Sequence, residues 1–126
     1  MSELTRKKNT TLWIVAGLAA LAFLGAGLPK LAGFQEFVNN FQRWGYPGWF
    51  VYLVGAVEVA GAILLLVPRT VTLASLLLGG DMLGALFTHV KAGEWPALAG
   101  PVVLLVLLAV AGWGRREELF LLPRSQ

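Results

Sequence analysis

Four ionisable side chains stand within or at the ends of long apolar stretches of this 126-residue sequence. Glu58 and Asp81 lie near the middle of their stretches, whereas Lys30 and His89 lie near the ends of theirs. Ionisable groups are costly inside a bilayer, so those found there are candidates for proton transfer or ligand binding. We therefore consider Lys30, Glu58, Asp81 and His89 as candidate functional residues. The structural alternatives are a carboxyl that only bonds a neighbouring helix, a snorkelling lysine and a solvated histidine.

The composition indicates which elements position these residues. Hydrophobic residues make up 57% of the chain and charged residues 13%, with a mean hydropathy of +0.72. These values exclude a typical soluble domain, a disordered chain and a disulfide scaffold, and they predict an integral membrane protein. Apolar stretches occur at 12–29, 49–67, 71–90 and 97–113. Each has about 17–20 residues, enough to cross a hydrocarbon layer of about 30 Å.

Residues 31–44 show a different pattern, with apolar and polar side chains alternating at three- and four-residue spacing. This spacing predicts an amphipathic helix that lies in the membrane interface and does not span it. The expected fold is therefore all-α: a single domain, residues 1–126, forming a four-helix transmembrane bundle with an interfacial helix between the first and second spans.

Basic residues predict the orientation. Seven lie on the side that carries both termini, and three lie on the other side: Arg6, Lys7, Lys8, Arg69, Arg115, Arg116 and Arg124, against Lys30, Arg43 and Lys91. The positive-inside rule then places both termini in the cytoplasm of a multi-pass inner-membrane protein.

The two central carboxyls raise a charge problem. Glu58 and Asp81 are expected at similar depths on adjacent antiparallel spans, with no basic residue at that depth. The least costly state keeps at least one carboxyl protonated, and Glu58→Gln is then expected to preserve folding. Asp81, Ala85, Thr88 and His89 share one helical face, which predicts a polar stripe running toward the outer surface.

Several other chemistries find no support in the sequence. The chain has no cysteine, which excludes disulfides and thiolate-held clusters. The net charge of +3 comes from basic residues at the ends of apolar runs, a pattern that sets membrane orientation and does not indicate nucleic-acid binding. His89 lies about 12 Å from Asp81 along the helix axis, too far to share a metal ion, so no metal site is predicted.

The sequence also resembles the DoxX-like family. The resemblance rests on the order and spacing of these pieces: Gly27-Leu28-Pro29-Lys30; Phe34 and Phe37 with Gly45-Tyr46-Pro47; Gly55 to Gly61 with Leu64 to Leu66 and Pro68-Arg69; and Met82, Ala85 and His89. It implies a small four-helix membrane protein in which Lys30, Glu58 and His89 match the family pattern. Some members belong to thiosulfate:quinone oxidoreductases and others associate with redox-stress enzymes.

The function expected from this resemblance is a subunit or accessory of a quinone-linked redox system. No intrinsic cofactor is expected, but a bound quinone is, in a pocket of Lys30, Trp49, Tyr52 and His89. Whether the chain is itself an enzyme stays open. The alternatives are a small proton-coupled transporter or channel-like protein, with Glu58 and Asp81 as its site, or a structural subunit without chemistry. The expected partners are the lipid bilayer, redox-enzyme subunits and further copies of the chain.

Overall fold

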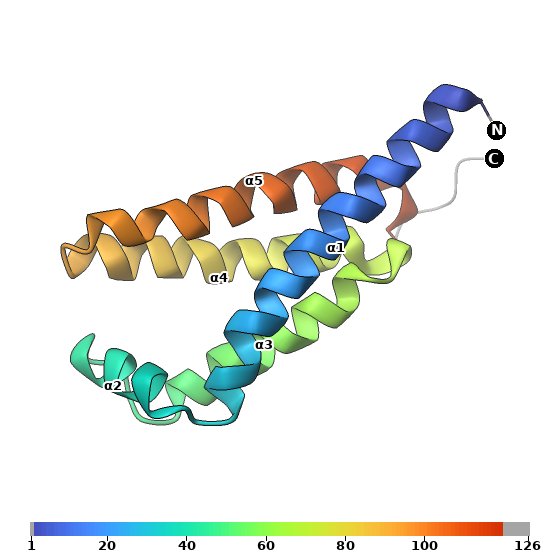
Figure 1. The fold of residues 1–126 in the computed structure, drawn as a ribbon. Coiled ribbons are helices and arrows are strands. Elements are labelled where there is room, and N and C mark those ends of the chain that lie inside the picture. Colours follow the sequence, from blue (N-terminus) through green and yellow to red (C-terminus); the bar gives the residue numbers. More distant parts are fainter. Residues whose placement is uncertain (1, 120–126) are drawn as a thin grey trace.

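Helices account for nearly all of the chain in the computed structural model, which describes residues 2–119 (Figure 1). In chain order they are α1 (Glu3–Leu31), α2 (Gln35–Arg43), α3 (Phe50–Leu65), η1 (Pro68–Thr70), α4 (Val71–Lys91), η2 (Trp95–Leu98), α5 (Ala99–Gly114) and η3 (Arg116–Glu118). No strand occurs in this range, so the all-α prediction is confirmed. Arg124, which contributed to the orientation argument, lies outside the described residues.

The helices differ in their capacity to cross a bilayer. Within residues 2–119, three segments are long and apolar enough to span: Glu3–Leu31, Pro68–Lys91 and Trp95–Gly114. Helix α3 has 16 residues and rises about 24 Å, which falls short of a hydrocarbon layer of about 30 Å. The segment predicted as amphipathic forms α2, which is only nine residues long.

Glycines in the left-handed conformation follow the ends of α2 and α4. Gly93 follows α4 with φ of +73°, and the next N–H, that of Glu94, donates to the carbonyl of His89 at 2.8 Å. Gly45 follows α2 with φ of +88°, and the N–H of Tyr46 donates to the carbonyl of Phe41 at 3.0 Å. This is the Schellman arrangement, in which the left-handed glycine turns the chain back over the helix end. It brings Glu94 and Tyr46 close to the helices that precede them.

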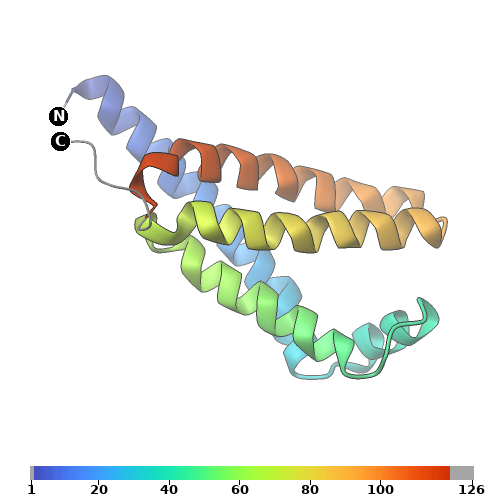
Figure 2. The same ribbon diagram turned by 180° about the vertical axis from the view of Figure 1, so that it is seen from behind.

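The four long helices pack in a ring, and the ring opens at one end. Helix α1 lies against α3 and α5, and α4 also lies against α3 and α5. The pair α1/α3 diverges from the pair α4/α5 toward α2, as both views show (Figures 1 and 2). The buried core lies where the pairs meet and includes Phe23, Leu65, Leu78 and Leu108. The molecule is therefore a wedge, with the described chain ends at its closed end and α2 at its open end.

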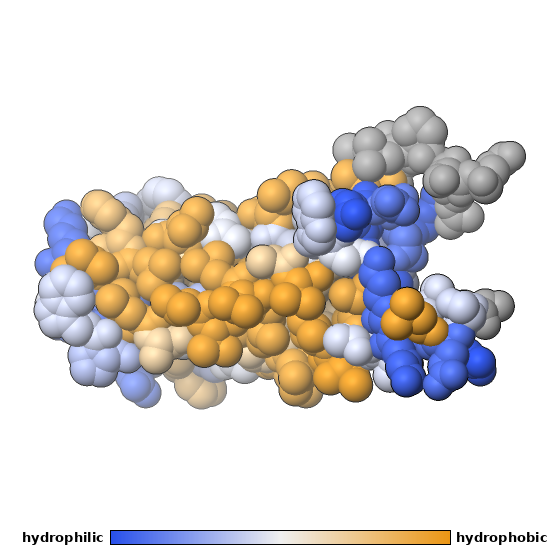
Figure 3. Space-filling model, turned by 90° about the horizontal axis from the view of Figure 1, so that it is seen from above, coloured by the Kyte–Doolittle hydropathy of each residue, from blue (hydrophilic) through white to orange (hydrophobic). Residues whose placement is uncertain are grey.

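The outer surface is an apolar belt between two polar ends (Figure 3). Large exposed side chains on this belt include Leu21, Leu76, Leu83 and Phe87. A soluble protein rarely exposes so much continuous apolar area, whereas lipid tails cover it without cost. The chain is a membrane protein.

Candidate functional site

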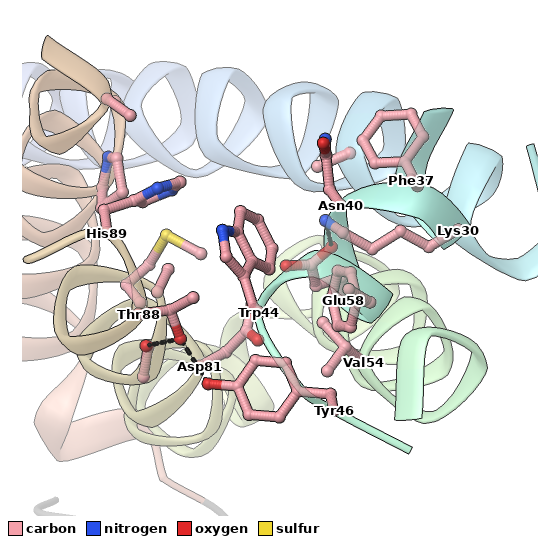
Figure 4. Close-up of a pocket in the computed structure, with 18 of the residues that line it drawn as sticks. Lys30, Phe37, Asn40, Trp44, Tyr46, Val54, Glu58, Asp81, Thr88 and His89 are labelled. Atoms are coloured by element: carbon pink, nitrogen blue, oxygen red, sulfur yellow. Dashed lines mark hydrogen bonds and ion pairs between the residues drawn. The ribbon is translucent and has the colours of Figure 1, made fainter. Parts of the chain in front are cut away.

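A cavity of about 830 Å³ lies in the open end of the wedge. Its walls differ in character (Figure 4). Aromatic side chains from α1, α2, the following loop and α3 form one part: Phe23, Phe37, Phe41, Trp44, Tyr46 and Phe50. Small residues from α4, α5 and the turn between them form another: Gly80, Gly84, Ala85, Ala97 and Gly100. The ionisable lining residues are Lys30, Arg43, Glu58, Asp81, His89 and Glu94.

Lys30 and Glu58 form an ion pair at the side of the cavity. Nζ of Lys30 donates to Oε1 of Glu58 at 2.6 Å, and Glu58 is only 2% exposed. Glu58 therefore points into the bundle. The expectation that no cation lies at its depth is wrong.

The direction of helical side chains explains that error. Each Cα–Cβ bond of an α-helix tilts toward the N-terminus of the helix. Lys30 lies in the last turn of α1, so its side chain points back into the membrane and not out to the interface. Glu58 lies on the antiparallel α3 and tilts toward the open end. The two side chains therefore approach each other from different depths.

Close contact between α1 and α3 makes this pair possible. A Cβ built on Gly55 would lie 2.8 Å from the backbone N of Leu31 and 2.8 Å from Cβ of Lys30. A Cβ built on Gly27 would lie 2.9 Å from Cβ of Glu58. Only glycine fits at these two positions without moving the helices apart.

Asp81 lies on α4 and also lines the cavity. Its Oδ2 atom is buried and has no hydrogen-bond partner within residues 2–119. The other members of the predicted polar stripe, Ala85, Thr88 and His89, line the cavity as well.

A second polar centre surrounds Glu94 at the open end. Its carboxylate accepts from Nδ1 of His89 at 2.9 Å and from Nε1 of Trp44 at 3.1 Å, and it pairs with Nη1 of Arg43 at 2.7 Å. Trp44 also lies edge-on to the His89 ring, with centroids 5.4 Å apart. Glu94 therefore connects α2 to the end of α4.

One further contact closes the same face. The Thr88 hydroxyl donates to the carbonyl of Gly84 at 2.9 Å, so the Tyr46 hydroxyl is the donor in the Tyr46–Thr88 hydrogen bond. Together with the contacts of Glu94, this hydrogen bond joins α2 and the loop after it to α4 and the turn that follows α4. The contacts of Glu94 with Arg43 and Trp44 are called the latch from here on.

The structure brings together only part of the predicted quinone pocket. Lys30 and His89 line the cavity, but Trp49 and Tyr52 do not. Their side chains are 62% and 45% exposed, and the Tyr52 hydroxyl lies against Gly33 on the outside of the α1–α2 turn. Trp44 and Tyr46 supply aromatic walls of the cavity instead.

Sequence reasoning missed Glu94 and its partner Arg43. Both residues lie outside the long apolar stretches, where charged residues are ordinary. The available signal was the turn chemistry, because a glycine directly after a helix places the next residue back over the helix end.

The latch gives a pH prediction. The hydrogen bond from His89, followed by those from Arg43 and Trp44, holds the pKa of Glu94 below the ordinary value of a glutamate. A carboxyl with a lowered folded-state pKa stabilises the folded form above its unfolded pKa, and this contribution is lost as the pH falls through the folded pKa. We expect a spin-label distance between Gln42→Cys and Ala92→Cys to stay constant down to about pH 5 and to lengthen well below it.

Glu94→Gln should lengthen this distance already at neutral pH, because the amide cannot pair with Arg43 as a carboxylate does. Glu36→Gln is the matched control, since Glu36 is an exposed α2 carboxylate outside the cavity. An unchanged distance in Glu94→Gln at neutral pH would mean that the latch does not hold α2.

Comparison with known proteins adds one finding. The sequence model of the DoxX-like family matches residues 14–111, a range that contains every residue lining the cavity. No curated protein and no solved structure gives a significant match.

Proposed function

Because this chain belongs to the DoxX-like family, we propose that it is an integral membrane subunit or accessory of a quinone-linked redox system. In this proposal the cavity in the open end of the wedge binds the quinone. The observation that carries the proposal is the cavity itself, since its size falls within the range of small-molecule sites, about 300–1,000 Å³.

The walls of the cavity suit a flat ring. A Cβ built on Gly80, Gly84 or Gly100 would meet no atom within 4 Å, so these glycines leave open space beside α4 and α5. Aromatic side chains of α2 and α3 line the same cavity. A planar ring can lie between the glycine wall and these aromatic faces, where offset stacking is favourable. An apolar tail would leave between the diverging helix pairs toward lipid.

His89 is the residue that we assign to the ring carbonyl. Its Nδ1 is committed to Glu94, which leaves Nε2 for a ligand. When His89 is protonated it can donate from Nε2, and when it is neutral Nε2 can accept from a hydroxyl. The Glu94 carboxylate fixes the orientation of the His89 ring. The Lys30 ammonium lines the same cavity and adds positive charge there, although it is paired with the Glu58 carboxylate.

A bound quinone would supply two-electron redox chemistry, and the chain's residues would bind it, orient it and exchange protons with it. The electrons would come from a partner subunit. This assignment makes the chain a quinone-binding subunit, whose catalytic partner carries the cofactor.

Filling the cavity tests the proposal. Gly84→Leu places a side chain into the cavity without a clash at its Cβ, whereas Gly79→Leu adds the same side chain outside the cavity on the same helix. We expect quinone to co-purify with the wild type and with Gly79→Leu. Gly84→Leu should bind decylubiquinone at least about tenfold more weakly, a loss of about 1.4 kcal/mol. Equal quinone binding by the three proteins would place any quinone outside this cavity.

The proposal includes a topology of four spans with both termini in the cytoplasm of the inner membrane. Helix α3 would cross a bilayer thinned locally, with Trp49 and Val67 extending its apolar ends. Its antiparallel contacts with α1 and α4 support this arrangement, since a helix packed along two spans lies within the same layer.

Cysteine labelling tests the topology directly, because the chain has no native cysteine. We expect a membrane-impermeant maleimide to label Gln42→Cys in spheroplasts and to label Lys8→Cys only after the membrane is permeabilised. Both positions are exposed. Labelling of both from the same side would contradict the topology.

A further inference from the structure

The cations that line the cavity are matched to carboxylates. Lys30 pairs with Glu58 at 2.6 Å and Arg43 pairs with Glu94 at 2.7 Å, while the His89 ring forms a hydrogen bond with the same Glu94 carboxylate at 2.9 Å. These contacts use every basic side chain of the cavity wall within residues 2–119.

Asp81 is the acidic residue of the cavity that is not paired with a cation within residues 2–119. No ion pair involves it in the described part of the chain, and its Oδ2 lacks a hydrogen-bond partner. The groups that face it are Glu58 on α3 and, behind Glu58, Lys30 on α1. A buried carboxylate without a cation is costly, so two states are favourable: the neutral acid, or the carboxylate with a cation beside it.

The aromatic walls already hold cations. Nζ of Lys30 lies 5.5 Å from the centroid of the Phe37 ring, and the Arg43 guanidinium lies 5.5 Å from that of Trp44. The faces of aromatic rings attract cations, most strongly where water is excluded. An aromatic cavity with one unmatched carboxyl has the chemistry that recognises an organic cation with an apolar surface.

We propose that this cavity binds lipophilic organic cations in exchange for the proton of Asp81. The free protein holds Asp81 as the neutral acid. When the cation enters, the carboxyl releases one proton to water and the carboxylate balances the single positive charge of the ligand. A neutral quinone, in contrast, binds while Asp81 keeps its proton, so the two ligands compete for one cavity in different protonation states.

Tetraphenylphosphonium is a suitable probe, with triphenylphosphine oxide as its neutral relative. Calorimetry on the full chain in lipid nanodiscs should show saturable binding of the cation. Its affinity should rise by up to about tenfold per pH unit between pH 6 and 8, because one proton leaves for each cation bound. Titration in buffers of different ionisation enthalpy should report about one proton released per cation.

Asp81→Asn keeps the shape of the neutral acid and removes the proton. We expect it to weaken cation binding at least about tenfold, to abolish the pH dependence and to leave binding of the neutral oxide unchanged. Glu36→Gln, which removes an exposed carboxylate outside the cavity, should bind the cation as the wild type does.

The outcomes separate this proposal from the quinone proposal. Asp81→Asn should still bind decylubiquinone, whereas Gly84→Leu should lose both ligands. Cation binding that is equal in wild type and Asp81→Asn, or that shows no proton release, would overturn the exchange. Binding no greater than that to empty nanodiscs would also overturn it, and none of these results would affect the quinone test.

Discussion

Lys30→Met is expected to lower the free energy of unfolding by about 3–5 kcal/mol, the range found when one partner of a buried ion pair is removed. The Lys30 ammonium is the cation beside Glu58, whose carboxyl is 2% exposed. Its removal leaves the buried Glu58 carboxyl without a cation beside it, in a cavity that Asp81 also lines. The measurement is SDS-induced unfolding in mixed micelles, followed by circular dichroism.

Glu58→Gln should cost less than Lys30→Met, although it removes the other half of the same pair. The ammonium that it leaves behind still has a carboxyl nearby, because Asp81 lines the same cavity as Lys30. The structure changes the expectation for this variant. Sequence reasoning predicted that Glu58→Gln would preserve folding, but it did so on the premise that no cation lay nearby.

The double variant Lys30→Met/Glu58→Leu distinguishes the contribution of the ion pair to the free energy of unfolding from that of side-chain packing. It removes both charges and keeps apolar volume, so it should recover much of the stability that Lys30→Met loses. Lys8→Met is the matched control, since it makes the same change at an exposed α1 position. If Lys30→Met lost no more than Lys8→Met, the pair would contribute no more than a surface ion pair.

Hydropathy was sufficient to predict where the helices lie. The predicted segments 71–90 and 97–113 compare with α4 at Val71–Lys91 and α5 at Ala99–Gly114. The first segment was predicted to begin at residue 12, but α1 begins at Glu3, where the Ser2 hydroxyl accepts from the N–H of Thr5 at 3.1 Å. A continuous apolar stretch marks only the membrane-embedded part of a helix, whereas local capping decides at which residue the helix begins.

Residue depth alone was not sufficient to predict the site. The predicted quinone pocket placed His89 beside Trp49 and Tyr52, but the wedge opens between the helix pairs and turns those two side chains outward. The expected depths also placed no cation beside Glu58. They were taken from Cα positions along each helix, which leave out the reach of the long Lys30 side chain. Contacts that depend on the angle between helix pairs, such as the one between Trp44 and Glu94, leave no periodic signal in the sequence.

Gly55→Ala is expected to have the second large effect, because it acts on the helix contact that supports the ion pair. The added methyl would lie 2.8 Å from the backbone N of Leu31 and 2.9 Å from the carbonyl O of Gly27. Backbone atoms cannot rotate away as the end of a side chain can, so α1 and α3 must move apart. Overpacking of this kind typically costs about 1–3 kcal/mol, and the separation would also lengthen the Lys30–Glu58 contact.

Gly25→Ala is the matched control, since a Cβ at Gly25 meets no atom within 4 Å and alanine favours the helix. We expect it to melt at or above the wild-type temperature and Gly55→Ala to melt well below it. If Gly55→Ala acts through the ion pair, its effect should be smaller in the Lys30→Met background than in the wild type, because the same interaction cannot be lost twice. Equal losses in both backgrounds would mean that the glycine contact stabilises the helix pair independently of Lys30. A wild-type melting temperature for Gly55→Ala would show instead that α1 and α3 do not approach each other as closely as the ion pair requires.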